Sequence, residues 1–356
     1  MALPFILPEG NPLTELTLGD LGWSQFFLSQ LDLEELEKTQ PARVSAVHRA
    51  GITAITTDGP RDLVLPPTLS AGDVAVGDWV LAHPEETRVE RLLERETALQ
   101  RGNDYHHGSQ QMIAANLDTL FITTSCNADF NVARLERYLA IAHDADITPV
   151  VVLTKADQSD DPDSYAEKAR ALGRGLDVVV LNAKSDEVPA MLAPWCGLGQ
   201  TVALAGSSGV GKTTLANALT GGNAATQGIR EDDARGRHTT TGRSLHRIPG
   251  GGWLIDTPGM RGLGVADVAV GIDTTFSEIS ELADHCKFRD CAHESEPGCA
   301  VQAAIAAGDI DPERLRRYQK LKREDQYATE TIAQVRDRYR KFGKMVRSAT
   351  QAKKKR

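Results

Sequence analysis

The sequence contains no long apolar run, and we expect no secretory leader. No stretch approaches the ~18 consecutive apolar residues that a membrane span needs, and the segment Met1 to Pro12 includes Glu9 but no basic region. Cysteines are few: the chain has five, and three of them lie within fourteen residues. This odd, clustered set argues against a disulfide framework and favours a metal site in a reducing compartment. We therefore expect a cytoplasmic protein with no membrane partner.

Length and charge indicate several domains and a nucleic-acid partner. A chain of 356 residues is long enough for two or three domains. Its net charge is −9, yet the segment Glu313 to Arg356 holds sixteen Lys and Arg against five Asp and Glu. An acidic body with a basic tail is typical of proteins that bind nucleic acid, although a solvated helical tail would show the same charge pattern.

The first hundred residues divide into an extension and a barrel pattern. Residues 1–40 contain an acidic amphipathic segment, which we interpret as a short helical extension without chemistry. Short alternating runs follow, separated by turn signals such as Asp58-Gly59-Pro60. These runs are residues 42–47, 51–56, 63–65, 78–82 and 88–93. The pattern predicts a small all-β barrel. An oligonucleotide-binding barrel, an SH3-like barrel and a purely structural module would all show it.

From residue 101 the pattern becomes an alternation of strands and helices. We interpret residues 101–111 as a linker. Apolar strands are predicted at 117–125, 148–154, 176–181 and 201–205, and helices at 132–142, 165–172 and 188–191. This alternation predicts a parallel sheet with helices on both faces.

The strand at 201–205 leads into a phosphate-binding motif. The segment that follows fits G-x-x-x-x-G-K-[ST] and continues as a helix. Backbone N–H groups of such a loop surround an anion, the lysine reaches the outer phosphates, and the first threonine can hold Mg²⁺. The nucleotide-binding residues predicted here are Gly206, Ser207, Ser208, Gly209, Val210, Gly211, Lys212, Thr213 and Thr214.

Two further motifs precede this loop, each at the carboxyl end of a predicted strand, where ligands bind in such sheets. The first consists of Thr154, Lys155, Ala156 and Asp157, and the second of Asn182, Ala183 and Lys184. The Asp157 carboxylate can accept two hydrogen bonds that guanine donates and adenine cannot, while the Lys155 stem can lie over the base. The second motif can offer a backbone N–H to the guanine oxygen. Each motif alone also occurs in structural loops, so the interpretation depends on their combination.

Two segments after the loop suit the γ-phosphate and its metal ion. In Arg237 to Thr241 a threonine can offer its hydroxyl to Mg²⁺, and we assign this role to Thr240. A predicted hairpin then ends at the D-x-x-G motif that begins with Asp256 and ends with Gly259. Asp256 would meet Mg²⁺ through water together with Thr213, and the Gly259 N–H would sense the γ-phosphate.

These motifs form a guanine-nucleotide set in an unusual order, because the base-reading motifs precede the phosphate loop. The order predicts a circularly permuted GTPase domain, which is physically reasonable because the ends of a compact α/β domain lie close together. It also places the D-x-x-G motif directly before the C-terminal segment.

That segment contains a cluster of metal-binding residues with the pattern Cys286-x4-Cys291-x-His293-x5-Cys299. Three sulfurs and one imidazole can satisfy a tetrahedral zinc ion and leave no position open, so the predicted site is structural. Cys126 and Cys196 stand apart from this cluster and are interpreted as small core residues.

Taken together, these features resemble the RsgA (YjeQ) family of small ribosomal subunit biogenesis GTPases. The resemblance covers residues 40–320 and rests on the segments Val76 to Val80, Ile113 to Asp118 and Gly236 to Thr241, the permuted motifs and the zinc spacing. It implies a multidomain α/β protein. Its domains would be an N-terminal extension (1–40), an OB-type β-barrel (41–100), a circularly permuted P-loop GTPase domain (101–268), and an α-helical zinc-binding domain with a basic tail (269–356).

The resemblance also implies partners and cofactors. These are the 30S ribosomal subunit with its 16S rRNA, GTP and GDP, one structural Zn²⁺, and Mg²⁺ bound with GTP. Hydrolysis would be faster on the subunit, and we expect a monomer. One residue departs from the family pattern: Thr154 stands where the base-reading motif usually has Asn, which weakens one hydrogen bond to the guanine side.

Water positioning is the open part of the predicted mechanism. Met260 follows the D-x-x-G glycine, where Ras-like enzymes have a glutamine, so intrinsic hydrolysis should be slow. We expect His238 to help position water once the ribosome orders its segment; a packing or RNA-contact role is the alternative. A zinc-containing regulatory GTPase that acts on a protein partner is the alternative function.

Overall fold

The computed structural model describes residues 16–102, 110–222, 243–256 and 265–329. The chain divides into two compact units, one of Met1–Gln100 with Met112–Gly262 and one of Arg101–Gln111 with Leu263–Arg356. The first unit holds both the barrel segment and the alternating segment, and the second holds the cysteine cluster. The boundaries between the four predicted domains stay a prediction. In the described ranges no helix has the length and apolar character to cross a membrane.

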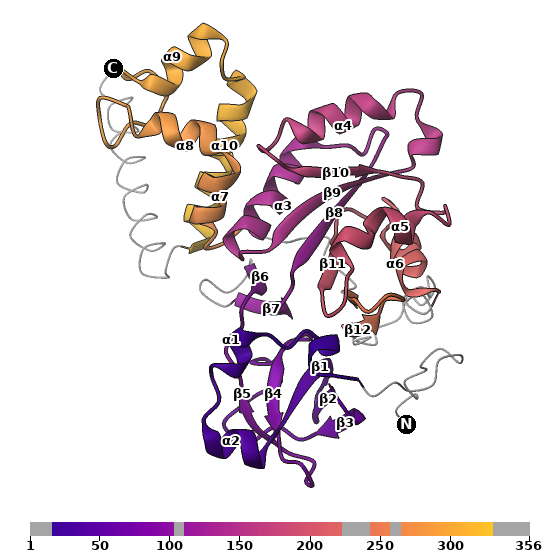
Figure 1. The fold of residues 1–356 in the computed structure, drawn as a ribbon. Coiled ribbons are helices and arrows are strands. Elements are labelled where there is room, and N and C mark those ends of the chain that lie inside the picture. Colours follow the sequence, from indigo (N-terminus) through magenta and orange to yellow (C-terminus); the bar gives the residue numbers. More distant parts are fainter. Residues whose placement is uncertain (1–15, 103–109, 223–242, 257–264, 330–356) are drawn as a thin grey trace, which may run out of the picture. The chain divides into compact units, whose positions relative to one another are not determined.

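Five strands of the first unit, indigo to violet in Figure 1, pair with one another in a ring that one isolated bridge closes. They are β1 (Gln40–His48), β2 (Gly51–Thr56), β3 (Gly59–Leu63), β4 (Trp79–Ala82) and β5 (Val89–Leu92). Antiparallel pairs join β1 to β2 and β4, β2 to β3, and β4 to β5. A parallel bridge between Val64 and Arg88 then links the end of β3 to β5. Buried apolar side chains, including Val44 and Val80, fill the core that these strands share. The pairings agree with the all-β pattern of the sequence.

The interpretation of Asp58-Gly59-Pro60 as a turn is wrong for its last two residues. Gly59 and Pro60 begin β3, and Pro60 pairs with Ile55 of β2. The chain reverses within Thr57 and Asp58 instead, and Gly59 has a φ of 118° that favours glycine. At Pro60, β3 has a ladder partner, β2, on one side only. Because no donor is needed on the other side, a proline, which has no N–H, is tolerated.

From residue 16 onwards, where its description begins, the N-terminal extension forms the short helices η1 (Gly19–Leu21), α1 (Gln25–Leu28) and α2 (Leu33–Lys38). Asp32 caps α2 and forms a capping box with Glu35. The ring of Trp23 lies edge-on to Trp79 of β4, with 4.8 Å between centroids. The extension is therefore packed against the barrel.

Residues 101–111 were expected to form a linker, and the structure corrects this at both ends. β6 (Ala98–Gly102) and β7 (Gln110–Ala115) pair as a separate two-stranded sheet. A two-stranded ribbon does not need a buried face along its whole length. The polar residues in this segment therefore do not show the alternation of apolar and polar residues that indicates a half-buried strand.

The alternating segment forms the sheet that positions the candidate site. Its strands are β8 (Thr119–Ser125), β9 (Thr148–Thr154), β10 (Asp177–Val180), β11 (Thr201–Ala205), β12 (Ser244–Arg247) and β13 (Trp253–Asp256). The order is β10-β9-β8-β11-β13-β12, and all but β12 run parallel. Ser244 of β12 pairs with Ala46 of β1, so the sheet continues into the barrel.

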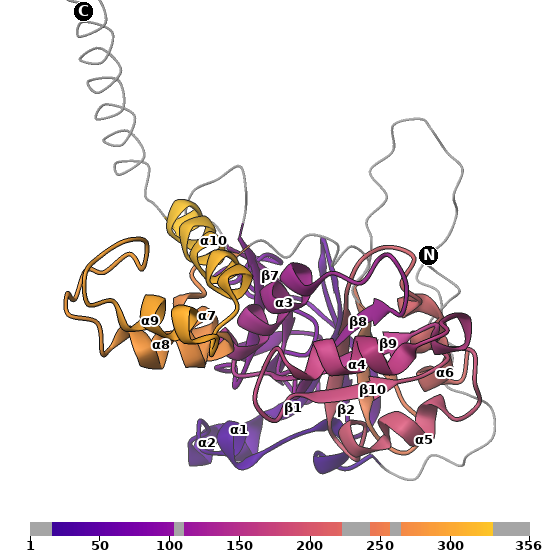
Figure 2. The same cartoon turned by 90° about the horizontal axis from the view of Figure 1, so that it is seen from above.

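Helices cover both faces of this sheet, as predicted (Figures 1 and 2). α3 (Val132–Asp144) and α4 (Pro162–Arg170) pack on one face, and α5 (Val188–Leu192) and α6 (Lys212–Thr220) on the other. The short turns η2 (Ala156–Gln158) and η3 (Ala193–Trp195) follow β9 and α5.

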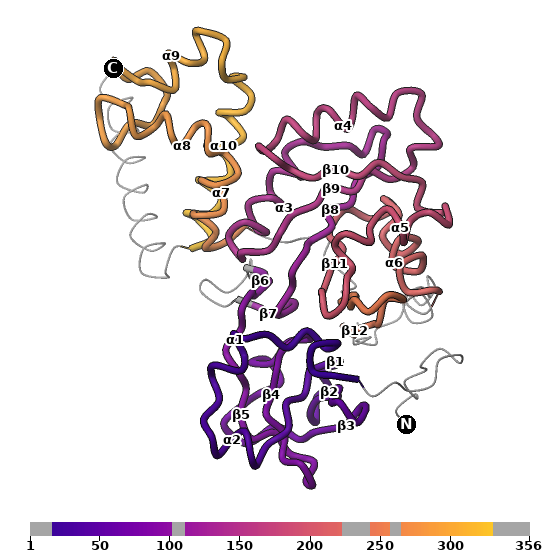
Figure 3. Tube along the Cα trace, in the orientation of Figure 1, coloured from indigo at the N-terminus to yellow at the C-terminus, as the bar shows by residue number. Residues whose placement is uncertain are grey.

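The chain path explains how a permuted order still builds one site (Figure 3). β11, which leads into the phosphate loop, lies between β8 and β13 although β8, β9 and β10 all precede it in sequence. Because the strands are parallel, the carboxyl ends of β9, β10, β11 and β13 lie at the same edge of the sheet.

The second unit contains α7 (Ala269–Thr275), α8 (Ser277–Ala283), α9 (Ala300–Ala307) and α10 (Pro312–Thr329). Phe276, fully buried between α7 and α8, lies under the guanidinium of Arg314 at 4.3 Å from the ring centroid. Arg314 Nε also donates to Glu278 at 2.7 Å. The basic segment that begins at Glu313 is helical in α10 as far as Thr329, and its remainder lies outside the described residues.

Candidate nucleotide site and metal centre

The phosphate loop leaves β11 with a backbone that only glycine fits well. Gly206 has a φ of 138°, and a Cβ there would lie 2.1 Å from the carbonyl oxygen of Thr123. Gly211 has a φ of 97° and begins α6 as its N-cap. Between them, Ser208 and Gly209 are exposed while Val210 is buried. The loop is thus anchored through Val210 and presents Ser208 and Gly209 to solvent.

Lys212 folds back over this loop. Its Nζ donates to the carbonyl oxygen of Gly206 at 2.9 Å and to that of Ser207. The ammonium group therefore lies over the concave backbone of the loop, where phosphates bind in proteins with this motif. Thr213, in the first turn of α6, is exposed.

Thr154 ends β9, as predicted, but its side chain has a partner that the sequence did not indicate. Its side chain is fully buried at the end of β9, and its hydroxyl donates to the carbonyl oxygen of Val210 at 2.6 Å. The Thr124 carbonyl oxygen lies 3.1 Å from the same hydroxyl. Thr154 therefore contacts the phosphate loop, and any effect it has on the base is indirect.

The other base-reading residues follow Thr154 at the same edge. Lys155 adopts the left-handed conformation with a φ of 55°, which sends the chain into η2, where Ala156 is half-buried and Asp157 is exposed. The Asp157 carboxylate is thus available to a ligand.

The second base motif is a tight turn. The Asn182 side-chain oxygen accepts from the Lys184 N–H at 3.0 Å, while Ala183 is buried. A Cβ on Gly211 would lie 3.6 Å from the Thr154 hydroxyl and 3.8 Å from the Ala183 Cβ. Both base motifs therefore lie on the side of Gly211 where a larger residue would carry its side chain.

Asp256 ends β13, next to β11, and its side chain is largely shielded from solvent. Burial raises the pKa of Asp256, and the nearby His246 partly opposes this shift. The pKa of His246 is lowered by its own burial, and its Nε2 lies 2.8 Å from the Ser244 hydroxyl. Sequence reasoning missed His246; the β12–β13 hairpin, which brings it beside Asp256, was the available signal.

Arg134 is a second residue that sequence reasoning missed. It lies in the first turn of α3, and its guanidinium donates to the hydroxyl of Ser207 in the phosphate loop. His238, Thr240 and Gly259 lie outside the described residues. Their assigned roles stay predictions.

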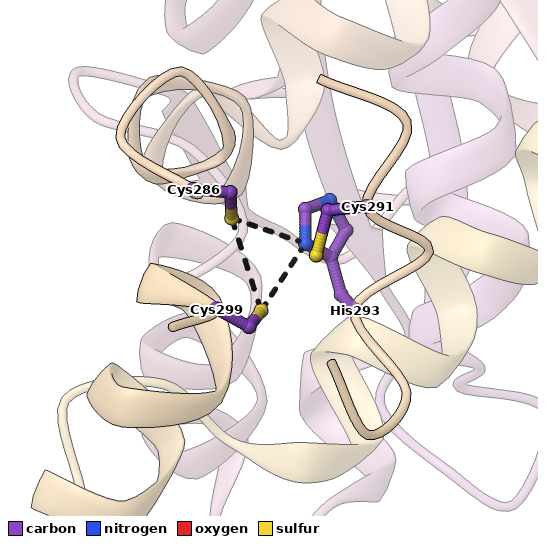
Figure 4. Close-up of side chains that lie close together, drawn as sticks. All are labelled: Cys286, Cys291, His293 and Cys299. Carbon is purple, nitrogen blue, oxygen red and sulfur yellow. Dashed lines mark hydrogen bonds between the residues drawn. The ribbon is translucent and has the colours of Figure 1, made fainter. Parts of the chain in front are cut away.

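In the second unit, four ligand atoms meet in one cluster (Figure 4). Nδ1 of His293 lies 3.6 Å from the Cys286 sulfur and 3.5 Å from the Cys299 sulfur, and these sulfurs are 3.8 Å apart. With Cys291, all four ligand atoms lie within 4.8 Å of one another. Tetrahedral zinc with Zn–S near 2.3 Å and Zn–N near 2.0 Å requires S···S of about 3.8 Å and S···N of about 3.5 Å. The cluster fits such a metal ion, with Nδ1 as the ligand nitrogen.

Two side chains brace the loop that carries these ligands. The Glu296 carboxylate accepts backbone N–H bonds from Ala292, Glu294 and Ser295 at 2.8–3.0 Å, and these bonds lower the pKa of Glu296 to about 2. Gln302 Nε2 donates to the His293 carbonyl oxygen at 2.6 Å. The ligand loop is therefore held in shape by the protein itself.

Known proteins share these features over nearly the whole chain. Residues 92–266 match the family described as RsgA GTPase. A Mesorhizobium japonicum protein named small ribosomal subunit biogenesis GTPase RsgA is 56% identical over 327 residues, which is 91% of this chain and 94% of that protein. A Vibrio vulnificus protein named small ribosomal subunit biogenesis GTPase RsgA 2 is 48% identical and covers 95% of this chain and 97% of its own length.

Two solved structures share the fold. YjeQ from Thermotoga maritima has a TM-score of 0.59 at 24% identity and covers 80% of this chain and 97% of its own. YloQ, described as a circularly permuted GTPase, has a TM-score of 0.57 at 22% identity and covers 82% and 97%. They confirm the permuted GTPase fold predicted from motif order. Because the chain matches this family model and is 56% identical to the Mesorhizobium japonicum relative over 91% of its length, it belongs to the RsgA GTPase family.

Proposed function

We propose that this GTPase binds the 30S ribosomal subunit, assists its late maturation and leaves it after hydrolysing GTP to GDP and phosphate. One observation carries the nucleotide part: the phosphate loop, both base motifs and Asp256 all lie at one edge of a parallel sheet. The ribosomal part is supported by relatives named for small ribosomal subunit biogenesis, one of them 56% identical.

In the proposed site each segment has a separate task. The Lys212 ammonium group donates to the carbonyl oxygens of Gly206 and Ser207. When GTP binds, it would donate to phosphate oxygens instead. The exposed Thr213 and the carboxylate of Asp256 would hold Mg²⁺, which neutralises phosphate charge when bound. Asp256 must be ionised for this task; burial raises its pKa and works against that form, so the positive charge of the bound ion would have to favour it.

Base selection would depend on Asp157, whose exposed carboxylate can accept from the two guanine donors. Lys155 and the second motif, Asn182 to Lys184, would flank the base. Thr154 would contribute through the phosphate loop, because its buried hydroxyl is already bonded to Val210.

The metal centre would hold one Zn²⁺ through Cys286, Cys291, His293 and Cys299. All four positions of a tetrahedral ion are filled by protein ligands, which supports a structural role without a place for substrate. The bound metal would join the loop after α8 to the start of α9, since Cys299 is the N-cap of α9.

The partner surfaces in this proposal are the barrel and the basic tail. The ring of β1 to β5, with its β3–β5 bridge, supports an OB-type barrel, a class that binds oligonucleotides. The basic segment after Glu313 would add phosphate contacts to 16S rRNA. We further propose that Thr240 binds Mg²⁺, that the Gly259 N–H senses the γ-phosphate, and that His238 helps to position water on the ribosome. A monomeric, cytoplasmic protein fits this role.

GTP turnover with and without purified 30S subunits tests the proposal, measured over a salt series from about 50 to 300 mM. We expect stimulation at low salt that falls as salt weakens phosphate contacts. An unstimulated rate at every salt concentration would reject the ribosomal role and favour a protein partner.

A further inference from the structure

Arg134 is held beside the phosphate loop by the start of α3. The Asn131 side chain caps this helix and accepts from the Arg134 N–H at 2.9 Å, which fixes the backbone of the first turn. α3 follows β8, and β8 is the direct neighbour of β11. The Arg134 side chain is half-buried, and its guanidinium reaches across to the Ser207 hydroxyl, 73 residues along the chain.

Two cationic groups consequently converge on one residue. Lys212 Nζ donates to the Ser207 carbonyl oxygen, and Arg134 donates to the Ser207 hydroxyl. Like charges this close repel each other, and more strongly where the groups are partly shielded from water. The N-terminus of α6, which begins at Lys212, adds further positive potential. Such an arrangement favours a ligand with several negative charges.

The protein itself supplies no opposite charge to Arg134 among the residues that the structure describes. Its guanidinium has Ser207 as a side-chain partner there, and that partner is a neutral hydroxyl. A guanidinium forms stronger, paired hydrogen bonds with phosphate oxygens than with a hydroxyl. The Arg134 guanidinium would therefore bind a phosphate group more strongly than it binds the Ser207 hydroxyl.

We propose that Arg134 is a phosphate-binding residue of this site, supplying from α3 a second cation to the GTP triphosphate beside Lys212. The inference rests on the proposed function, because it adds a contact to the same nucleotide site. Arg134 belongs to none of the sequence motifs that define that site, and its position is set by the packing of α3 alone.

Titration of a non-hydrolysable GTP analogue into the full chain tests the proposal. Arg134→Ala should raise the dissociation constant by about 10- to 100-fold, the effect of losing charge-assisted hydrogen bonds. Arg134→Lys should give an intermediate value, because it retains a charge but not the planar fork. Arg170→Ala, which removes an exposed arginine from α4, is the matched control and should bind like the unaltered chain.

A second comparison separates direct phosphate binding from an effect through the loop. If Arg134 binds phosphate, Arg134→Ala should weaken binding by the same factor in a Ser207→Ala background. Loss of the effect in that background would show that Arg134 acts only through Ser207 and would overturn the proposal. Thermal unfolding without nucleotide checks that each variant is folded.

The two levels of inference fail in different ways. Tight analogue binding by the unaltered chain, together with unchanged binding by Arg134→Ala, would overturn the role of Arg134 and leave the proposed function intact. Absence of binding by the unaltered chain would overturn both.

Discussion

The hydroxyl of Thr154 donates a hydrogen bond to the carbonyl oxygen of Val210 at 2.6 Å, and both residues are buried. Thr154 ends β9 and begins a base-reading motif, whereas Val210 belongs to the phosphate loop. A single bond thus ties the segment proposed to select the base to the segment proposed to hold the phosphates. A threonine can provide this link because one hydroxyl donor suffices.

Loss of that bond should lower both the stability of the domain and its affinity for nucleotide. Thr154→Val keeps the shape of the side chain but leaves a buried carbonyl group unpaired. We expect a loss of about 1–3 kcal/mol in the free energy of unfolding and a higher dissociation constant for both GTP and GDP. Urea unfolding and nucleotide titration measure the two effects. Thr154→Ser retains the donor and should lose less; equal losses in both variants would contradict the role of the hydroxyl.

Asp157→Asn should change the base preference. An amide cannot accept both guanine donors, but it can pair with the carbonyl group that xanthine has in place of the guanine amino group. The preference should therefore shift from GTP towards xanthosine triphosphate, measured by competition between the two nucleotides. Asp160→Asn, an exposed change three residues away, is the control. Unchanged GTP affinity in Asp157→Asn would show that this carboxylate does not read the base.

Glu296→Gln should weaken metal binding without removing a ligand. The carboxylate accepts three backbone N–H bonds in the ligand loop, and a neutral amide would accept them less strongly. We expect about a 10-fold loss in zinc affinity, as for other groups that orient metal ligands. Competition with a chromogenic chelator measures it. Glu294→Gln alters an exposed neighbour and should behave like the unaltered chain; a matching loss there would point to a general charge effect.

His143 should make stability depend on pH. Burial lowers the pKa of this imidazole, near the end of α3, below its usual 6.5. The unfolded chain therefore binds a proton more readily than the folded one. Its contribution to stability is complete above pH 6.5 and is lost as the pH falls below that value. Urea unfolding at pH 7.5 and at successively lower pH should show a shallower decline for His143→Gln than for the unaltered chain; identical slopes would refute this contribution.

Local spacing in the sequence was enough for the motifs and for most of the elements that carry them. The phosphate loop needs glycines at Gly206 and Gly211 for its own backbone, and the four metal ligands lie within fourteen residues. The alternation of buried strands and helices predicted the parallel sheet, since continuous apolar runs occur where both faces of a strand are covered. Such requirements involve neighbours along the chain, so they can be recognised without a structure.

Pairing across the chain could not be recognised in this way. Gly59 and Pro60, expected in a turn, proved to be the start of β3, and β6 and β7 pair at the two ends of a segment expected to be a linker. Arg43 is the clearest case, because it occupies an ordinary polar position in a predicted strand. In the structure it is 1% exposed and donates to the Thr201 hydroxyl at 2.6 Å, and burial lowers its pKa to about 10.

The sequence by itself therefore determined which chemical groups are present and the order of the motifs along the chain. Tertiary structure decided which groups meet: Thr154 with Val210, Arg134 with Ser207, and Arg43 with Thr201. The physical reason is that each pair joins residues more than fifty positions apart. Hydrogen bonds of that kind depend on strand order and helix packing, neither of which leaves a periodic or spacing signal in the amino-acid sequence.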